Sequence, residues 1–355
     1  MLFEQFVEER NISKRTMKSY QTAIRKYELF NVMTIEDLIR EADEEESQGI
    51  RWKDRKIKQR LIKFRKEVYN TNLSSSAQMY MQRVTTFYRH YEVELHPLPP
   101  MSRVNMCNSE PISFKDIPTK EILRKAIRES KSKVFSTIIY FMSSTGLAMV
   151  DTLDLTIKDF LVACDALSID ELDNCKNTIP TFTLKRRKTG KYFYTFATPE
   201  ATSEVINYLK SRTDELTENS QLFKISRDYL CKQFQSMNKH LGLGTKNGSS
   251  LFRSHMLRKY HASTLLNSGL MIEQVDMLQG RSKEKTHESY FFDDPEVLKK
   301  LYMEHMDDLC IADESDEIIE LKKINEEYEV KFSEQEKLLN DIVEAQEKLE
   351  KLFEL

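Results

Sequence analysis

Apolar residues recur at three- to four-residue steps along most of the first hundred positions. This spacing gathers their side chains on one face of a helix. It predicts four helices, around Met17–Tyr27, after Thr34, around Ile57–Val68 and around Tyr80–Phe87. Thr34, three residues before Asp37, has the form of a helix N-terminal cap. Four helices in so short a span predict a compact all-α domain over residues 1–95.

A proline-rich stretch, His96-Pro-Leu-Pro-Pro100, interrupts the helical spacing. Proline lacks an amide donor and fixes φ, so we expect an extended linker over residues 96–118. Helical spacing resumes beyond Thr119, a candidate N-cap. Apolar helices are predicted around Ile122–Ile127 and Val134–Phe141.

The period then changes from that of a helix to that of a strand. Two β-rich runs, Thr181–Leu184 and Tyr192–Phe196, flank a basic segment with a Thr-Gly turn signal. They predict a β-hairpin with a basic tip. Beyond Pro199 the pattern is again mostly helical, apart from a glycine-rich loop over 242–248. We therefore expect residues 119–310 to form a second domain, mainly α with a small β-sheet.

The last part of the chain has a different pattern from either domain. Residues 311–355 carry 6 basic and 15 acidic side chains, a net charge of −9. Their apolar residues fit one 3-4 spaced register, with Lys331 and Gln335 as its polar positions. This pattern predicts a long, acidic, coiled-coil-like helix. It leaves open whether the helix packs on its own chain or on a second protomer.

Composition narrows the class of protein. The chain has 355 residues, 54 Lys and Arg, 57 Asp and Glu, and 40% hydrophobic residues. These numbers suit two or three domains with real cores, and no apolar run approaches the roughly 18 residues of a membrane span. The charged start does not have the pattern of a signal peptide. Five cysteines without a CxxC argue against a disulfide scaffold and a zinc site. We expect a cytoplasmic protein that uses no membrane, metal or cofactor.

Without its acidic tail the chain is mildly basic, which permits a nucleic-acid partner without requiring one. Basic residues are densest over 51–66, where the candidates for phosphate contact are Arg51, Lys53, Lys56, Arg60 and Lys63. At the predicted hairpin they are Lys185, Arg186, Arg187 and Lys191. Lys and Arg side chains neutralise backbone phosphates. A solvated helix face is the alternative for 51–66.

The clearest chemical signal is spread over the second domain. His255 and Arg258, three residues apart, fall on the same side of a predicted helix. Arg281 follows Arg258 by 23 residues, and Tyr290 follows Arg281 by nine. Lys188 lies at the tip of the predicted hairpin, in a Lys-Thr-Gly sequence.

In these motifs and spacings the chain resembles the tyrosine site-specific recombinases, or phage-type integrases, with the archaeal variety the nearest. That family has an HxxR box, a Gly-His or Gly-Trp turn 23 residues later and a nucleophilic tyrosine nine residues further on. The resemblance covers residues 1 to about 305. It implies a four-helix core-binding domain followed by the recombinase catalytic domain, with the long C-terminal helix beyond.

The resemblance also implies a role for each residue. Tyr290 would attack a DNA phosphodiester and form a 3′-phosphotyrosine, which leaves a free 5′-hydroxyl. Arg258 would hold the non-bridging oxygens, and Arg281, where the family has His or Trp, would be a further phosphate donor. Lys188 would protonate the leaving oxygen, and His255 would take the phenol proton or hold the phosphate.

A plainer role is open to each of these residues. His255 and Arg258 could be a pair on a helix surface, and Tyr290 could be a core aromatic. Arg281 could cap a helix. Lys188 has two lysine neighbours on the hairpin that could take its role.

One position departs from the family pattern. The family's first arginine follows a Thr-Gly-Leu-like turn, where this chain has Ala148. Asp151, three residues on, matches the family's acidic residue. Loss of one oxyanion donor typically costs roughly 10²–10³ in rate. The chain could be a disarmed variant, Arg253 could supply the missing guanidinium, or the protein could bind DNA with little cleavage.

The resemblance thus implies integration or excision of a mobile element, carried out on double-stranded DNA with a specific recombination site. It also implies four protomers on the DNA, in a nucleoid-associated complex. Alternatives are a catalytically weak or inactive DNA-binding relative and a type IB topoisomerase-like enzyme. A third alternative is an interaction protein whose main function is carried by the coiled-coil-like helix.

Overall fold

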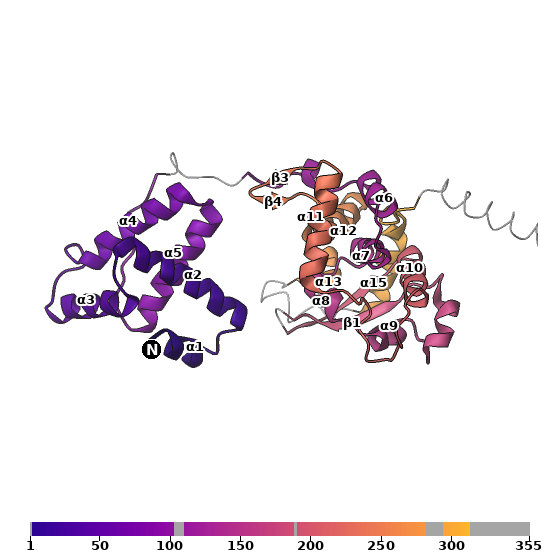
Figure 1. The fold of residues 1–355 in the computed structure, drawn as a ribbon, viewed down its shortest axis with the longest axis horizontal. Coiled ribbons are helices and arrows are strands. Elements are labelled where there is room, and N and C mark those ends of the chain that lie inside the picture. The colour runs from indigo at the N-terminus through magenta and orange to yellow at the C-terminus, as the bar shows by residue number, and fades with distance from the viewer. Residues whose placement is uncertain (1, 103–109, 188–189, 282–293, 313–355) are drawn as a thin grey trace, which may run out of the picture. The chain divides into compact units, whose positions relative to one another are not determined.

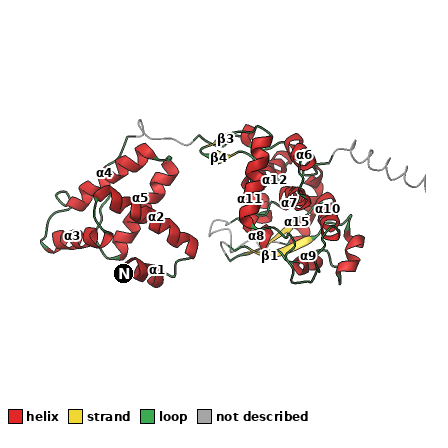
Figure 2. Ribbon diagram, in the orientation of Figure 1, coloured by secondary structure: helices red, strands yellow, loops and turns green. Residues whose placement is uncertain are grey.

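The computed structural model describes residues 2–102, 110–187, 190–281 and 294–312. The chain divides into two compact units, Met1–Pro111 and Ile112–Leu355, each with its own hydrophobic core (Figure 1). Helices make up most of the described residues, and the strands form two short sheets (Figure 2). Lys188, Tyr290 and the predicted acidic helix beyond Ala312 lie outside the described residues.

The first unit contains the four predicted helices and one more. Its described helices are α1 (Leu2–Glu9), α2 (Lys14–Asn31), α3 (Ile35–Ser47), α4 (Lys56–Thr71) and α5 (Ser74–His90). The short α1 has no long apolar stripe, and it is held by the burial of Phe6 in the core. The predicted cap at Thr34 is confirmed, because its side chain accepts a hydrogen bond from the amide of Asp37 at 3.2 Å.

Aromatic residues fill the core of the first unit. Tyr27 lies edge-on to Phe64, with ring centroids 4.9 Å apart, and the Tyr88 hydroxyl donates to that of Tyr27 at 3.3 Å. Each of these rings is fully buried. Burial of one such side chain stabilises a fold by about 1.5–3 kcal/mol, so this cluster accounts for the close packing of α2, α4 and α5.

The second unit begins with η1 (Phe114–Asp116), α6 (Lys120–Arg128), α7 (Lys133–Thr145), α8 (Met149–Asp154), α9 (Ile157–Ala163) and η2 (Ile169–Cys175). Helix α7 is buried on almost all sides, its serines and threonines near the C-terminal end included, which is typical of a helix in a core. It packs against α6, α10 (Pro199–Lys210) and α12 (Ser254–Ser268), as Figure 1 shows. The predicted N-cap at Thr119 is confirmed.

The predicted β-hairpin is also confirmed. Strands β1 (Thr181–Lys185) and β2 (Tyr192–Phe196) are antiparallel, in register from Thr181 opposite Phe196 to Lys185 opposite Tyr192. Phe182 and Phe193 lie on the same face of the hairpin and are buried in the core, which fixes the register because a shift by one residue would move a strand's side chains to the other face.

The rest of the unit is α11 (Arg227–His240), β3 (Thr245–Lys246), β4 (Ser249–Ser250), α13 (Ile272–Leu278), α15 (Pro295–His305) and η3 (Met306–Asp308). The glycine-rich stretch predicted as a loop over 242–248 is partly a short hairpin, β3–β4. Its Lys246 ammonium lies 2.7 Å from the Asp116 carboxylate and holds η1 in place. Two-residue strands carry too little alternation to be read from a sequence.

Candidate active site

The site is built around Arg258, in the second turn of α12. Its side chain is buried, with 5% of the residue exposed. Nη1 donates to the carbonyl oxygen of Gly146 and Nη2 to that of Gln279, each at 2.5 Å. The guanidinium therefore joins three segments that are far apart in sequence: the turn after α7, helix α12 and the end of α13. The predicted helix-surface pair of His255 and Arg258 is not what the structure has, because Arg258 is buried and His255 is exposed.

Gly146 is required at its position for two reasons. It ends α7 in the left-handed region, with φ +62°, where a side chain is strained. A Cβ added there would also lie 2.5 Å from Nδ1 of His261. The turn thus directs the Gly146 carbonyl to Arg258 and leaves room for the His261 ring.

His261 and Gln279 form a buried polar pair behind Arg258. The Gln279 amide donates to the backbone carbonyl of Arg258 at 2.9 Å and contacts Nδ1 of His261 at 3.0 Å. Both side chains are fully buried, and His261 Nε2 and Gln279 Oε1 have no partner among the described residues. Sequence reasoning missed this pair. The signal was available, because His261 stands three residues after Arg258, one further turn along the same helix face.

Burial and like charges shift the pKa values of this cluster. Desolvation, together with the charges of Arg186 and Arg281, lowers the pKa of Arg258 to about 9. Complete burial, with Arg258 and Arg281 nearby, lowers the pKa of His261 to about 3. Partial desolvation and neighbouring cations also lower the pKa of His255. At neutral pH, Arg258 is therefore charged and His261 is neutral.

Arg281 follows α13 and remains near Arg258. Its amide donates to the Asp276 carbonyl at 2.8 Å, and its Nη1 lies 3.0 Å from the Asp276 carboxylate. The helix-capping alternative thus holds for its backbone. Its side chain is 39% exposed and forms an ion pair with the Asp276 carboxylate. This ion pair makes the Arg281 guanidinium a weaker donor to another anion.

The basic hairpin divides its cations between two environments. Arg186 Nη1 donates to the Gly280 carbonyl at 2.5 Å, beside the acceptor of Arg258. Arg187 points elsewhere and pairs with the exposed carboxylate of Asp154 at 2.8 Å. The Lys185 ammonium lies 5.6 Å from the centre of the Tyr192 ring, and Lys191 is exposed.

Ala148 occupies the N-cap of α8, two residues after Gly146. Arg253, considered above as a substitute for the missing arginine, is the N-cap of α12, and its guanidinium donates to the Ser250 carbonyl. Burial lowers the pKa of Arg253. No described contact joins Arg253 to the turn at Ala148.

Two other tyrosines of the second unit are poor nucleophiles. Tyr302 is fully buried, and its hydroxyl donates to the Ser144 carbonyl at 3.0 Å. Tyr260 is 4% exposed, and its hydroxyl lies 3.5 Å from the Asp308 carbonyl. Burial raises the pKa of both phenols.

The basic segment of the first unit is only partly available to a ligand. Arg60 forms a two-pronged ion pair with Glu41, at 2.7 and 3.1 Å, and Lys56 lies 3.3 Å from the same carboxylate. Lys63, by contrast, is exposed, and no described ion pair involves it. Arg51 and Lys53 are exposed in the turn before α4, where Lys53 lies 4.0 Å from Asp54.

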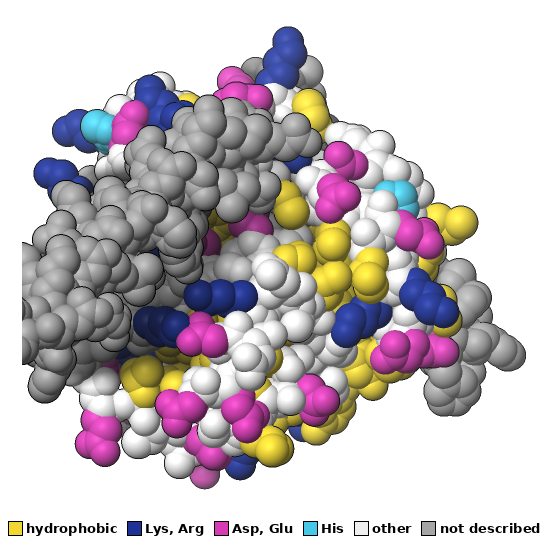
Figure 3. All heavy atoms as spheres, turned by 90° about the vertical axis from the view of Figure 1, so that its right-hand side faces the viewer, with side chains coloured by type: hydrophobic (Ala, Val, Ile, Leu, Met, Phe, Trp, Pro, Cys, Tyr) yellow, Lys and Arg dark blue, Asp and Glu magenta, His cyan; other side chains and the backbone are white. Residues whose placement is uncertain are grey.

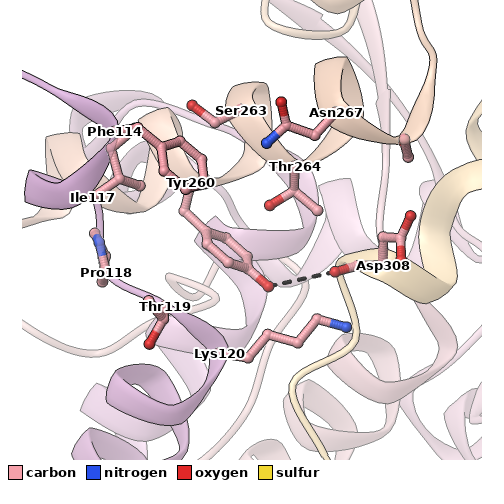
Figure 4. Close-up of a pocket in the computed structure, with 11 residues that line it drawn as sticks. Phe114, Ile117, Pro118, Thr119, Lys120, Tyr260, Ser263, Thr264, Asn267 and Asp308 are labelled. Atoms are coloured by element: carbon pink, nitrogen blue, oxygen red, sulfur yellow. Dashed lines mark hydrogen bonds between the residues drawn. The ribbon is translucent and has the colours of Figure 1, made fainter.

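One face of the described surface has mixed charge. In the face that Figure 3 shows, acidic and basic side chains are interspersed among apolar ones. A hollow of about 410 Å³ lies beside Tyr260, between η1, α12 and η3 (Figure 4). No set of three or more metal-ligating side chains occurs in the described part of the chain, and no described helix is long and apolar enough to cross a membrane.

No protein-family model and no curated protein matches the sequence. Solved structures do match. A XerH site-specific recombinase bound to its difH substrate in a pre-cleavage complex has 20% identity and a TM-score of 0.51, over 84% of this chain and 82% of that one. A lambda integrase (75-356) dimer on a COC′ core site has 13% identity and a TM-score of 0.52, over 82% and 95%. A Tn1549 transposon integrase with transposon right end DNA has 12% identity and a TM-score of 0.51, over 85% and 97%.

The chain therefore has the tyrosine recombinase fold, and the expected architecture, mainly α with a small β-sheet, is confirmed. At such low identities the likeness concerns the fold alone. The archaeal variety and the role of each site residue stay predictions.

Proposed function

We propose that this protein is a site-specific DNA recombinase that cuts and rejoins DNA through a 3′-phosphotyrosine. The observation that supports this most is Arg258, a buried and charged guanidinium held by two carbonyls within a recombinase fold. Two of its five N–H donors serve those carbonyls, and three are left for an anion. A buried cation with no ion pair among the described residues favours an anionic ligand.

The proposed reaction uses only groups of the chain and the DNA. The Tyr290 phenol oxygen attacks phosphorus, the bond to the 5′-oxygen breaks, and Lys188 donates a proton to that oxygen. Arg258 donates hydrogen bonds to the non-bridging oxygens, where charge develops. His255 accepts the phenol proton; its lowered pKa keeps it neutral and able to do so at pH 7. A 5′-hydroxyl of another strand reverses these steps, so the bond energy is retained and no cofactor is consumed.

A suicide substrate tests this function. Duplex DNA with a nick close to the candidate site traps the covalent adduct, because the short fragment diffuses away. We expect an adduct with the natural chain, none with Tyr290→Phe, and an undiminished yield with Tyr229→Phe, a control at an exposed tyrosine of α11. Peptide mapping identifies the linked residue. An adduct on any tyrosine other than Tyr290 contradicts the assignment.

A second candidate function is DNA binding with little cleavage, and Ala148 favours it. No guanidinium occupies the position where the resemblance places the first arginine. The same assay separates the two functions at equal DNA occupancy: a binder would saturate the DNA and leave no adduct. Religation of a relaxed circle without exchange between sites would instead indicate the topoisomerase alternative.

We further propose that both units bind duplex DNA: the first, which contains residues 1–95, through 51–66, and the second through the hairpin. Lys63 is the best candidate of the first unit, because it is exposed and unpaired among the described residues. Lys63→Ala should reduce the slope of log affinity against log salt by about one. Arg60→Ala should mainly lower the stability of the first unit and have less effect on the salt dependence of DNA binding, since Arg60 is paired with Glu41. An unchanged slope for Lys63→Ala would identify 51–66 as a solvated face.

The acidic segment 311–355 is proposed to join protomers, four on two duplexes, and to be dispensable for cleavage. Its net charge repels DNA. Glu200 accepts hydrogen bonds from the amides of Ile311, at 2.8 Å, and Ala312, at 2.5 Å, so a chain ending after Ala312 keeps these contacts. This truncation should leave single-turnover cleavage intact and reduce the higher-order complexes seen on DNA. Loss of cleavage with assembly unchanged would contradict the proposal.

A further inference from the structure

The guanidiniums of Arg186 and Arg258 donate hydrogen bonds to the carbonyl oxygens of two consecutive residues. Arg258 Nη2 donates to the oxygen of Gln279, and Arg186 Nη1 donates to that of Gly280, both at 2.5 Å. Arg258 belongs to α12, whereas Arg186 is the first residue after β1. The chain thus brings two arginines from different elements to adjacent points at the end of α13.

These two arginines differ from the other cations nearby. Arg281 and Arg187 each pair with a carboxylate, Asp276 and Asp154 respectively. No ion pair of Arg186 or Arg258 occurs among the described residues, and both are at least partly buried. Two neighbouring charges of the same sign, partly removed from water, repel each other. A bound anion would relieve that repulsion.

At the Gly146 carbonyl, no described contact brings a second cation to Arg258. There the acceptor is the Gly146 carbonyl, and Ala148, two residues on, ends in a methyl group. Arg253 is held at the Ser250 carbonyl instead. Among the described cations near Arg258, the one without an ion pair therefore comes from the hairpin and not from the turn between α7 and α8.

We propose that Arg186 is the second guanidinium of the phosphate site and takes the role left open at Ala148. This assignment rests on the function proposed above and adds Arg186 to the residues that contact the reacting phosphate. One N–H of Arg186 serves the Gly280 carbonyl, and four remain for phosphate oxygens. Arg186 and Arg258 together can hold both non-bridging oxygens of one phosphodiester as its charge develops.

The first test is the single-turnover rate of adduct formation on the nicked substrate, at saturating DNA. Arg186→Ala should lower this rate about 100-fold, and Arg186→Lys should recover only part of the loss, because an ammonium cannot bind bidentately. Arg128→Ala, at an exposed arginine of α6, controls for the loss of one charge and should leave the rate unchanged. Arg186→Gln keeps an N–H for Gly280 without the charge and should be as slow as Arg186→Ala. A rate within twofold of the natural chain for Arg186→Gln would overturn the proposal.

The second test is rescue. If Arg186 fills the role open at Ala148, adding Ala148→Arg to Arg186→Ala should raise the cleavage rate of that variant at least tenfold. The same Ala148→Arg change in the natural chain should raise the rate by less than it does in Arg186→Ala. Equal gains in both backgrounds would mean that the two positions act independently, and would overturn the shared role.

The third test does not depend on cleavage. Inorganic phosphate should raise the melting temperature of the second unit in the natural chain, and should do so clearly less in Arg186→Gln and in Arg258→Gln. If the natural chain forms no adduct on any DNA, the proposed function fails. The rise in melting temperature caused by phosphate still shows whether Arg186 belongs to an anion site. Equal shifts in the natural chain and Arg186→Gln would overturn the proposal whatever the adduct assay gives.

Discussion

Acid should destabilise the second unit through His261, and the variant His261→Asn should remove that sensitivity. The His261 ring is fully buried beside the cations Arg258 and Arg281, and its pKa is lowered from 6.5 to about 3. The Gln279 amide contacts Nδ1 with an N–H, which also favours the neutral ring. Asparagine presents an oxygen close to the position of Nδ1 and does not titrate.

The sign and the size follow from linkage. Below pH 6.5 the unfolded chain takes up a proton at His261 and the folded chain does not, so stability falls with pH until the folded pKa is reached. Each pH unit costs about 1.4 kcal/mol. At pH 4.5, two units below 6.5, the loss from this residue is about 3 kcal/mol relative to pH 7. Above pH 6.5 it contributes no pH dependence.

The measurement is urea unfolding of the full chain at pH 7 and pH 4.5, followed by hydrogen exchange in α12 peptides. His261→Asn is expected to be less stable at pH 7, because part of the ring volume is left empty. Its loss of stability between the two pH values should nevertheless be about 3 kcal/mol smaller than that of the natural chain. His255→Asn, at an exposed histidine of the same helix, should recover much less. Equal losses for the natural chain and His261→Asn would refute the reasoning.

Further expectations concern a glycine and two cations. Gly146→Ala should destabilise the second unit by more than about 2 kcal/mol, because it adds overpacking against His261 to backbone strain; Gly242→Ala, with φ +66° and open space around it, isolates the strain alone. Similar unfolding free energies for these two variants would contradict the packing argument. Arg60→Ala should destabilise the first unit, while Lys63→Ala should leave its urea midpoint within error, because only Arg60 has a described ion pair. The reverse order would show that the Glu41 pair contributes nothing.

The sequence predicted the elements of this fold better than its site. The stripe through Ile57, Leu61 and Phe64 needs only local spacing to be recognised, and all three side chains are buried in α4. The caps at Thr34 and Thr119 are local in the same way. What the sequence lacks is a signal for contacts between distant segments.

Arg258 shows this limit. Its motif could be found in the sequence, but its two acceptors lie 112 and 21 residues away, and any backbone carbonyl could have served. Arg186 was indistinguishable from Arg187 in the sequence, and only the fold separates the residue beside Arg258 from the one paired with Asp154. Tyr290 lies outside the described residues and stays a prediction from spacing.

The two carbonyls that hold Arg258 also determine the stage at which its side chain loses conformational freedom. A free arginine or lysine side chain carries about 2 kcal/mol of rotamer entropy, which a ligand must remove on binding. Arg258 has already lost that freedom on folding, since Gly146 and Gln279 fix its guanidinium in one orientation. An anion bound there would therefore meet a guanidinium that is already ordered, whereas an exposed cation such as Lys63 would lose its freedom only on binding. In this chain the cost of ordering Arg258 is consequently part of the folding free energy of the second unit, and it would not be part of the free energy of anion binding.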